Sequence, residues 1–196
     1  MPHLVLLGDS IFDNGFYTGG EPDVISRVRE LLPEGWKASL VAVDGSSTEK
    51  IPAQVERIPL DATHIILSVG GNDAIESLGV VEGFENRYRG AVEACRKTGL
   101  PLTVCTIYHG CFSDPDYQRS VVAAIIAFND VIIRVAGELK IPVIDLRLVC
   151  TEPTDFSNSI EPSAIGGAKI ALCIVEAVKR SGTGGVEIIL GRKLLV

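Results

Sequence analysis

The chain has 196 residues, of which 46% are hydrophobic and 22% are charged, and its formal net charge at pH 7 is −7. This length and composition predict a single soluble globular domain. The acidic balance argues against a nucleic-acid or anionic-membrane partner, because no cluster of basic residues is available to neutralise phosphate groups. No basic segment followed by an apolar one precedes the first predicted strand, so we expect a cytoplasmic protein without a signal peptide.

Two further patterns argue against other classes of protein. The longest apolar stretch, residues 121–137, is interrupted by Asn129, Asp130 and Arg134, which indicates a buried helix and not membrane insertion. The cysteines are odd in number and no two are spaced as CxxC, which is typical of reduced thiols and argues against a zinc site. They are Cys95, Cys105, Cys111, Cys150 and Cys173.

In chain order, predicted strands alternate with predicted helices. The strands are short apolar runs, as expected for strands that are buried on both faces of a parallel sheet. They cover residues 4–7, 39–43, 64–69, 102–107 and 143–146, and the helices cover 23–32, 51–55, 84–97, 121–139 and 164–180. This alternation predicts an α/β fold, a three-layer α/β/α sandwich around a five-stranded, mainly parallel sheet. We expect residues 1–181 to form this domain and residues 182–196 a C-terminal extension, as a hairpin or an edge strand.

The residues that follow the strands carry the chemistry. All carboxyl ends of a parallel sheet lie at one edge, and ligands bind there. The first strand runs into Gly8-Asp9-Ser10, the second is followed by Gly45, and the third by Gly70-Gly71-Asn72-Asp73. A serine oxygen, a glycine N–H and an asparagine amide at one edge supply an attacking oxygen and donors for an oxyanion, which is the minimum for acyl transfer. The sequence therefore predicts an acyl-transfer site around Ser10.

In the order and spacing of these segments, the chain resembles the SGNH hydrolases, also called the GDSL family of esterases and lipases. Gly8-Asp9-Ser10 looks like the first block of that family, Gly45 like the glycine of its second block, and Gly70-Gly71-Asn72-Asp73 contains the Gly-x-Asn-Asp of its third. The resemblance implies a flavodoxin-like fold with Ser10 as the nucleophile. It also implies an oxyanion hole made by the backbone N–H groups of Ser10 and Gly45 and the side chain of Asn72.

The last block of the family is where this sequence departs. That block reads Asp-x-x-His, followed by a proline and, a few residues later, by a glycine. Here Pro162 and Gly166 set the register, so Glu161 stands in the histidine position and Asn158 in the aspartate position. The usual catalytic base is therefore absent.

Two accounts of the base follow from the residues. In the first, Glu161 is the base, burial raises its pKa, and the amide of Asn158 donates a hydrogen bond to it where an aspartate would repel it. In the second, His109 is the base and Glu161 orients it, as the acid of a serine triad does. His3 and His64 stand at the amino ends of their predicted strands, so His109 is the histidine placed to reach Ser10.

Several other polar residues have structural as well as functional interpretations. Asp13, Asn14 and Tyr17 follow the nucleophile closely and are candidates for loop hydrogen bonding or substrate contact. Asp73 fits a helix cap and Asp155 a turn former better than a catalytic acid.

The pattern as a whole predicts a serine hydrolase of the esterase or acylesterase type. It would cleave a small ester or an acetylated molecule by attack of Ser10, without a metal or an organic cofactor, and the polar segment 110–120 would form part of the pocket mouth. The alternative is a catalytically weak or inactive protein of the same fold that binds a small ligand at the same edge.

Overall fold

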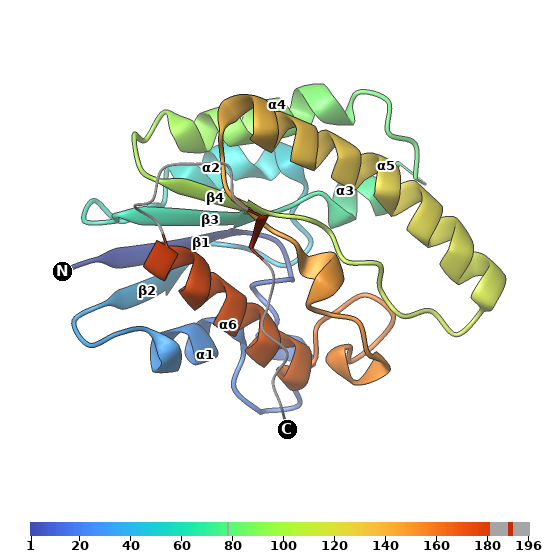
Figure 1. The fold of residues 1–196 in the computed structure, drawn as a ribbon, viewed down its shortest axis with the longest axis horizontal. Helices are drawn as coiled ribbons and strands as arrows, with labels where there is room; N and C mark the ends of the chain where they lie inside the picture. Colours follow the sequence, from blue (N-terminus) through green and yellow to red (C-terminus); the bar gives the residue numbers. More distant parts are fainter. Residues whose placement is uncertain (78, 181–187, 190–196) are drawn as a thin grey trace.

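The computed structural model describes residues 1–77, 79–180 and 188–189 of the chain (Figure 1). The strands pair in parallel in the order β2-β1-β3-β4-β5-β6. They are β1 (His3–Gly8), β2 (Lys37–Leu40), β3 (His64–Ser68), β4 (Leu102–Cys105), β5 (Val143–Ile144) and β6 (Ile188–Ile189). The first five follow the flavodoxin-like order, so the predicted three-layer α/β fold is confirmed. The two residues of β6 form an edge strand within the predicted C-terminal extension, and the rest of residues 182–196 lie outside the described residues.

Helices cover both faces of the sheet, as Figure 1 shows. On one face α1 (Val24–Leu31) packs against α6 (Ala164–Arg180), and on the other lie α2 (Ile51–Val55), α4 (Phe84–Arg96) and α5 (Pro115–Leu139). The short helix α3 (Gly71–Glu76) begins shortly after β3. Single turns of 3₁₀ helix stand in the loops, namely η1 (Gly15–Tyr17), η2 (Thr48–Lys50), η3 (Leu146–Leu148) and η4 (Pro153–Asp155).

The alternation of side chains along β1 divides the core between the two faces. Leu4 and Leu6 pack with the residues of α1 and α6, whereas Val5 and Leu7 pack with those of α2, α4 and α5. All four side chains are fully buried, which explains why this central strand reads as a continuous apolar run.

Helix α5 is the predicted buried helix, but it begins earlier than the apolar pattern indicates. The Asp114 side chain accepts hydrogen bonds from the backbone N–H groups of Asp116 and Tyr117, and Pro115 occupies the first turn, so the helix starts at Pro115 and not at Val121. By length and apolar composition alone α5 could cross a membrane. Its C-terminal half nevertheless contributes to the core, with Phe128 and Ile132 fully buried.

The second strand also differs from its prediction, because it ends at Leu40 and not at Val43. The backbone N–H groups of Val41 and Ala42 both donate to the carbonyl of Leu6, at 2.9 and 3.0 Å, so the regular pairing with β1 stops there. Two N–H groups on one carbonyl are a local irregularity of the bulge type, which an apolar run does not reveal. The chain after β2 therefore turns toward the exit of β1.

Two side-chain amides hold the chain where β1 and β4 end. Gln54 accepts from the N–H of Gly8 and donates to its carbonyl, both at 2.8 Å, and Asn129 makes the same pair of bonds with Ile107, both at 2.7 Å. Both amides are buried. Each supplies the backbone with hydrogen bonds that a neighbouring strand would otherwise make, at a position that water does not reach. Gly8 itself has φ +137°, and a Cβ there would lie 1.8 Å from the carbonyl oxygen of Ser68. Only glycine fits this exit, which leads directly to Ser10.

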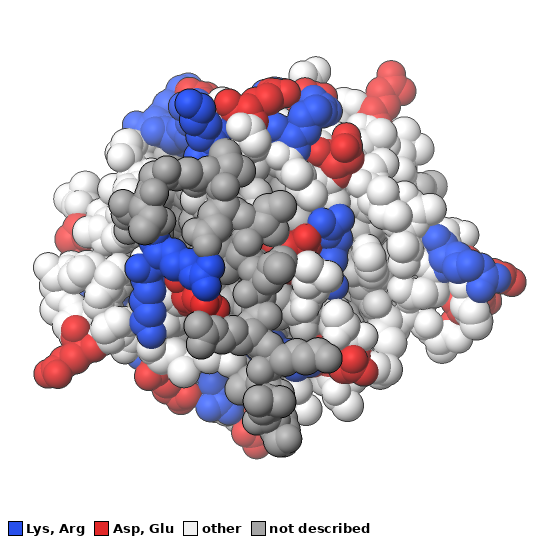
Figure 2. Space-filling view, in the orientation of Figure 1, with Lys and Arg blue, Asp and Glu red and all other residues white. Residues whose placement is uncertain are grey.

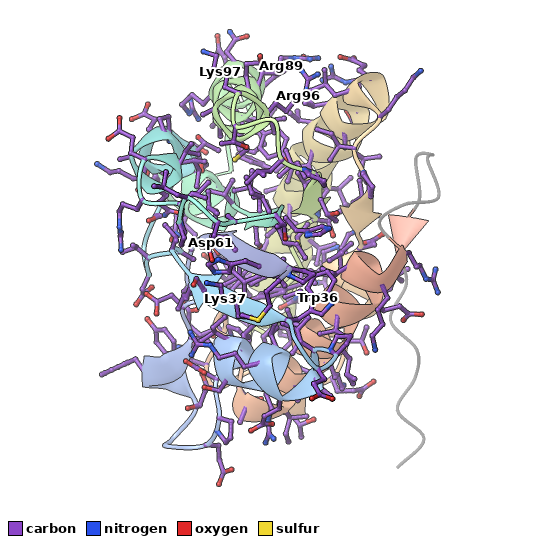
Figure 3. The ribbon with its side chains drawn as sticks, turned by 90° about the vertical axis from the view of Figure 1, so that its left-hand side faces the viewer. Trp36, Lys37, Asp61, Arg89, Arg96 and Lys97 are labelled. Carbon is purple, nitrogen blue, oxygen red and sulfur yellow. The ribbon has the colours of Figure 1, made fainter. Side chains whose placement is uncertain are left out.

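The opposite, amino-terminal edge of the sheet carries a polar brace of its own. His3 Nδ1 lies 2.9 Å from Asp61 Oδ1 and His3 Nε2 lies 2.8 Å from Ser39 Oγ. Lys37 forms an ion pair with the same aspartate, and Figure 3 shows Lys37 and Asp61 side by side. His3 and His64 begin β1 and β3, so both lie at the edge away from Ser10, as predicted. His3 therefore ties three segments together far from the candidate site.

The surface over α4 and α5 mixes charges of both signs (Figure 2). Arg89 pairs with Glu85 and Glu138, at 2.8 and 2.6 Å, and Arg134 pairs with Glu85 at 2.8 Å. These basic groups are neutralised locally by carboxylates of the same two helices.

Candidate active site

The exits of β1 and β3 lie next to each other, at the point where the strand order reverses direction. This is where ligands bind in open α/β sheets. A cavity of about 370 Å³ opens there, and its polar lining consists mainly of Asp9, Ser10, Asn72, His109 and Glu161. Its walls are mostly apolar and come from α3, the β4 exit, the first half of α5 and the loop before α6, with Ile75, Ile107, Phe112, Val121, Ile125 and Ile160 among them.

The turn that carries Ser10 is fixed by hydrogen bonds to its neighbours. The carbonyl of Asp9 accepts from the N–H groups of Phe12 and Asp13, at 3.1 and 3.0 Å. Asp13 Oδ2 in turn accepts from the N–H of Asp44, at 3.0 Å, and Tyr17 donates to the Asp44 carboxylate, at 2.8 Å. Asp13 and Tyr17 therefore join the β1 exit to the β2 exit and do not line the cavity.

Asn14 is a structural residue as well. It is fully buried, its Oδ1 accepts from the N–H of Val24 at 2.9 Å, and its Nδ2 donates to the carbonyl of Pro162 at 3.2 Å. The bond to Pro162 ties the Ser10 turn to the residue that follows Glu161. Of the two uses considered for Asn14, loop hydrogen bonding is the one seen.

Of the residues expected to form the oxyanion hole, Ser10 and Asn72 line the cavity and Gly45 does not. Asn72 lines it, and one N–H of its amide donates to the carbonyl of Ser46 at 3.0 Å, which leaves the second N–H for a ligand. Gly45 stands in the adjoining turn with φ +74°, exposed and outside the cavity lining. Asp73 is buried and accepts from the backbone N–H and the hydroxyl of Thr48, at 2.9 and 2.5 Å. Its role is thus to hold η2 beside α3, and not to cap its own helix.

Glu161 stands on a closed loop that Asn158 shapes. Asn158 Oδ1 accepts from the N–H groups of Ile160 and Glu161, both at 2.9 Å, while Phe156 and Pro162 form an antiparallel bridge at the base of the loop. We predicted that the Asn158 amide would donate to the Glu161 carboxylate. The structure instead shows its carbonyl oxygen holding the backbone of Glu161, because the loop must satisfy two N–H groups at its tip.

This loop docks on the chain that leaves β4. Tyr108 donates from its hydroxyl to the carbonyl of Ile160 at 2.6 Å, and the N–H of Cys111 donates to the carbonyl of Ser159 at 2.7 Å. Gly110 has φ +68°, and a Cβ there would lie 2.6 Å from the Ser159 carbonyl oxygen, so the two segments approach as closely as backbones can. The β4 exit thus positions the segment that carries Glu161.

Asp155 anchors the same loop to α6. It is fully buried, pairs with Lys169 at 2.6 Å and accepts from the N–H groups of Thr151 and Glu152, both at 3.0 Å. A Cβ on Gly166 would lie 2.1 Å from the Asp155 carbonyl oxygen, which explains the glycine within the first turn of α6. The interpretation of Asp155 as a turn residue agrees with these contacts.

Ser10 and Glu161 meet at the polar end of the cavity. Both side chains are largely buried, with exposed fractions of 8% and 7%, and Oε2 of Glu161 has no hydrogen-bond partner. Burial raises the pKa of the Glu161 carboxyl, a hydrogen bond with the Ser10 side chain lowers it, and the nearby Asp44 carboxylate raises it, so that the net shift is upward. A carboxylate with a raised pKa beside a serine hydroxyl is suited to accept its proton.

His109 lines the same cavity, but the charged residues that shift its pKa are not the ones that act on Glu161. Its Nε2 is buried without a partner, and burial lowers the pKa of its ring, with Arg147 adding to the effect and Asp145 opposing it. Arg147 and Asp145 pair at 2.7 and 2.6 Å beyond the end of β5. Among the described residues, no hydrogen bond joins the His109 ring to Ser10 or to Glu161. The hydrogen-bonded chain from Ser10 through His109 to Glu161 that the second account requires is not present.

The sequence did not single out four residues that shape this site. Asp9 lines the cavity beside Ser10, Gln54 and Asn129 hold the strand exits, and Tyr108 holds the Glu161 loop. Of these four, Asn129 could have been found from the sequence, because it interrupts a long apolar run and a buried amide must find hydrogen-bond partners.

An α/β fold of flavodoxin-like order with a serine at the exit of its first strand defines the class of this protein. The family model of the GDSL-like lipase/acylhydrolase family matches residues 6–166, and the chain belongs to this family. At the level of the family, the protein is therefore assigned to the esterases and lipases. Among curated proteins, none matches the sequence.

Solved structures of esterases and lipases share the fold. An extracellular lipase from Streptomyces rimosus superposes with a TM-score of 0.70 at 15% identity, covering 91% of this chain and 99% of its own. The psychrotrophic esterase EstA from Pseudoalteromonas sp. gives 0.70 at 13% identity, with 91% and 97% covered. An acetyl xylan esterase, AlAXEase, gives 0.67 at 18% identity, with 90% and 99% covered.

Proposed function

We propose that this protein is a serine hydrolase of the esterase type, in which Ser10 is the nucleophile and Glu161 is its base. The observation that carries this proposal is that Ser10 and the buried Glu161 line the same cavity and that hydrogen bonding to the Ser10 side chain lowers the pKa of the Glu161 carboxyl. A serine needs an adjacent acceptor for its proton to attack a carbonyl, and Glu161 is the proposed acceptor.

The reaction proceeds in two steps with one proton carrier. Glu161 takes the hydroxyl proton as Ser10 Oγ bonds to the acyl carbon, and the carbonyl oxygen becomes an oxyanion. The backbone N–H groups of Ser10 and Gly45 and the free N–H of Asn72 are the proposed donors to that oxygen. Glu161 then returns the proton to the leaving alkoxide, which departs as an alcohol. Water repeats the sequence on the acyl-enzyme, and the acid is released.

A carboxylate in the histidine position calls for a compensating environment. The ordinary pKa of a glutamate is about 4.3, some two units below that of imidazole, so it is a weak acceptor in water. Burial of Glu161 raises its pKa toward the working range of a base. His109 is the competing base, because it lines the same cavity and its buried Nε2 has no partner.

The cavity also favours a class of substrate. Its walls are mainly apolar, and the described residues that line it include the carboxyl group of Glu161 but no Lys or Arg. We infer that the acyl group is short to medium and uncharged, and that an acyl chain ending in a carboxylate is rejected by like charge.

The test is covalent labelling combined with turnover. Wild type, Ser10→Ala and the control Ser120→Ala are treated with a fluorophosphonate and digested for peptide mass spectrometry, and each is assayed with p-nitrophenyl butyrate and with the p-nitrophenyl monoester of succinate. Ser120 lines the cavity, but its hydroxyl is bonded to the Asp116 carbonyl. We expect the label on Ser10, butyrate turnover that requires Ser10 and not Ser120, and at least tenfold slower turnover of the succinate. Absence of both the label and Ser10-dependent turnover contradicts the hydrolase and favours the ligand-binding alternative.

A further inference from the structure

The carboxyl group of Asp9 is a buried acid for which the proposed reaction has no use. Asp9 is 2% exposed, yet it lines the cavity next to Ser10. Its Oδ1 accepts one hydrogen bond, from the N–H of Ile11 at 3.1 Å. Among residues 1–77 and 79–180, no Lys, Arg or His forms an ion pair with it. A buried carboxylate without a cation is costly, and such a group keeps its proton instead.

The groups that face Asp9 increase this cost. Glu161 on the loop before α6 and Asp73 on α3 both act on it with negative charge, while Cys105 of β4 and Tyr108 after it are neutral near pH 7. The charge of Asp73 is partly offset by Arg87, at 3.5 Å. Burial first, and then the charges of Glu161 and Asp73, raise the pKa of Asp9 to about 8, against hydrogen bonds from the backbone N–H groups of Ile11 and of Asp9 itself.

The second oxygen of Asp9 lies near Gly71 at the start of α3, next to the proposed oxyanion donor Asn72. Oδ2 is 4.0 Å from the position that a Cβ on Gly71 would take, and Gly71 and Asn72 line the cavity beside it. Because Oδ1 already accepts an N–H, the proton belongs on Oδ2. A neutral carboxylic acid in this position is a hydrogen-bond donor directed into the site.

We propose that Asp9 is a further catalytic residue, a neutral acid whose Oδ2–H donates a hydrogen bond to the substrate oxygen that becomes the oxyanion. The inference rests on the proposed function. Asp9 keeps its proton throughout, so the reaction remains balanced with Glu161 as the only proton carrier. Ionisation of Asp9 removes a donor and puts a second negative charge beside the oxyanion, and both changes oppose attack.

The test is the alkaline limb of kcat/KM for p-nitrophenyl butyrate in wild type, Asp9→Asn, Asp9→Ala and the surface control Glu93→Gln. Asparagine keeps an acceptor for Ile11 and a donor at the Oδ2 position but cannot ionise. With a pKa of about 8, roughly 3% of Asp9 is protonated at pH 9.5, so wild type and Glu93→Gln should fall about thirtyfold from their maxima. Asp9→Asn should stay within threefold of wild type at pH 7 and lose the limb, whereas Asp9→Ala should be at least tenfold slower at pH 7.

A measurement without turnover separates this inference from the proposed function. In protein labelled with ¹³C at the aspartate carboxyl carbons, one resonance absent from Asp9→Asn should titrate near pH 8. A resonance that titrates near pH 4, or an alkaline limb unchanged in Asp9→Asn, overturns the role of Asp9. If instead Ser10→Ala is as active as wild type, the proposed function fails, and the catalytic role of Asp9 fails with it while the titration still reports its proton.

Discussion

Polar side chains at the carboxyl edge of the sheet fall into two sets that differ in whether their hydrogen-bonding groups have partners. Gln54, Asn129 and Asp73 are buried and their hydrogen-bonding groups are engaged by backbone or by neighbouring side chains. Glu161 and His109 lie at the same edge, and each keeps a buried polar atom without a partner. The first set closes the exits of β1, β3 and β4, and the second set faces the cavity.

The difference shows which groups maintain the fold and which are available to a ligand. A buried polar group without a partner destabilises the folded state, and such groups in a native protein call for an explanation. Those of Glu161 and His109 belong to residues that line one cavity together with Asp9 and Ser10, whereas Gln54, Asn129 and Asp73 are not among its lining residues. The contrast predicts that truncating Gln54, Asn129 or Asp73 destabilises the protein. It also predicts that neutralising a carboxylate in the cavity stabilises the protein but slows catalysis.

The largest expected effect on stability comes from Gln54→Ala. The change leaves the N–H of Gly8 buried and unpaired and removes one of the two hydrogen bonds to its carbonyl, which keeps the bond from Val43, so the free energy of unfolding should fall by about 2–3 kcal/mol. Urea titration followed by circular dichroism measures it. Gln118→Ala is the control, because this side chain on α5 bonds to the partly exposed backbone of His109 and Phe112 and its loss should cost less than about 1 kcal/mol. Equal losses in the two variants would contradict the contrast.

A smaller effect is expected at Asn158, where Asn158→Ala removes the acceptor for Ile160 and Glu161. The free energy of unfolding should fall by about 1 kcal/mol, as for the loss of a cap. Asn158→Asp keeps both bonds and should preserve stability. Its added negative charge should raise the pKa of Glu161 further and move the acid limb of kcat/KM to higher pH. An acid limb that does not move would show that Asn158 and Glu161 do not interact electrostatically.

The smallest expected effect has the opposite sign. Because the pKa of Glu161 is raised in the folded state, the folded protein binds the proton more tightly than the unfolded chain. Stability is therefore highest below the ordinary glutamate pKa and is lost as pH rises through the folded-state value. Glu161→Gln should raise Tm by a few degrees at pH 8 relative to wild type and leave it unchanged at pH 4, by differential scanning calorimetry. A lower Tm at pH 8 would mean that the carboxylate is a structural brace.

The fold was predictable from the sequence because four of its strands, β1, β3, β4 and β5, lie within short apolar runs and each long helix has an apolar face. The order of Ser10, Gly45 and Asn72 along the chain was visible for the same reason, since strand exits of a parallel sheet share one edge. The register set by Pro162 and Gly166 also predicted Glu161 for the site, and Glu161 lines the same cavity as Ser10.

The remaining features depend on contacts between distant segments. The start of α5 depends on a side-chain cap at Asp114, and the end of β2 on a shared carbonyl at Leu6. The direction of the Asn158 amide could not be predicted, because it depends on which backbone N–H groups the loop leaves unpaired. The burial of Asp9 near the carboxylates of Glu161 and Asp73 could not be predicted, because it arises only when three segments meet.

The central claim is that Glu161 activates Ser10, and the rate of Ser10 phosphonylation tests it most directly because it needs no knowledge of the substrate. The rate constant with a fluorophosphonate should be measured from pH 4 to pH 7 in wild type, Glu161→Gln and His109→Ala. The account predicts a rate that rises with deprotonation of Glu161, falls about 10²- to 10⁴-fold in Glu161→Gln, and changes less than tenfold in His109→Ala. A rate that survives in Glu161→Gln and is lost in His109→Ala would contradict it and make His109 the base.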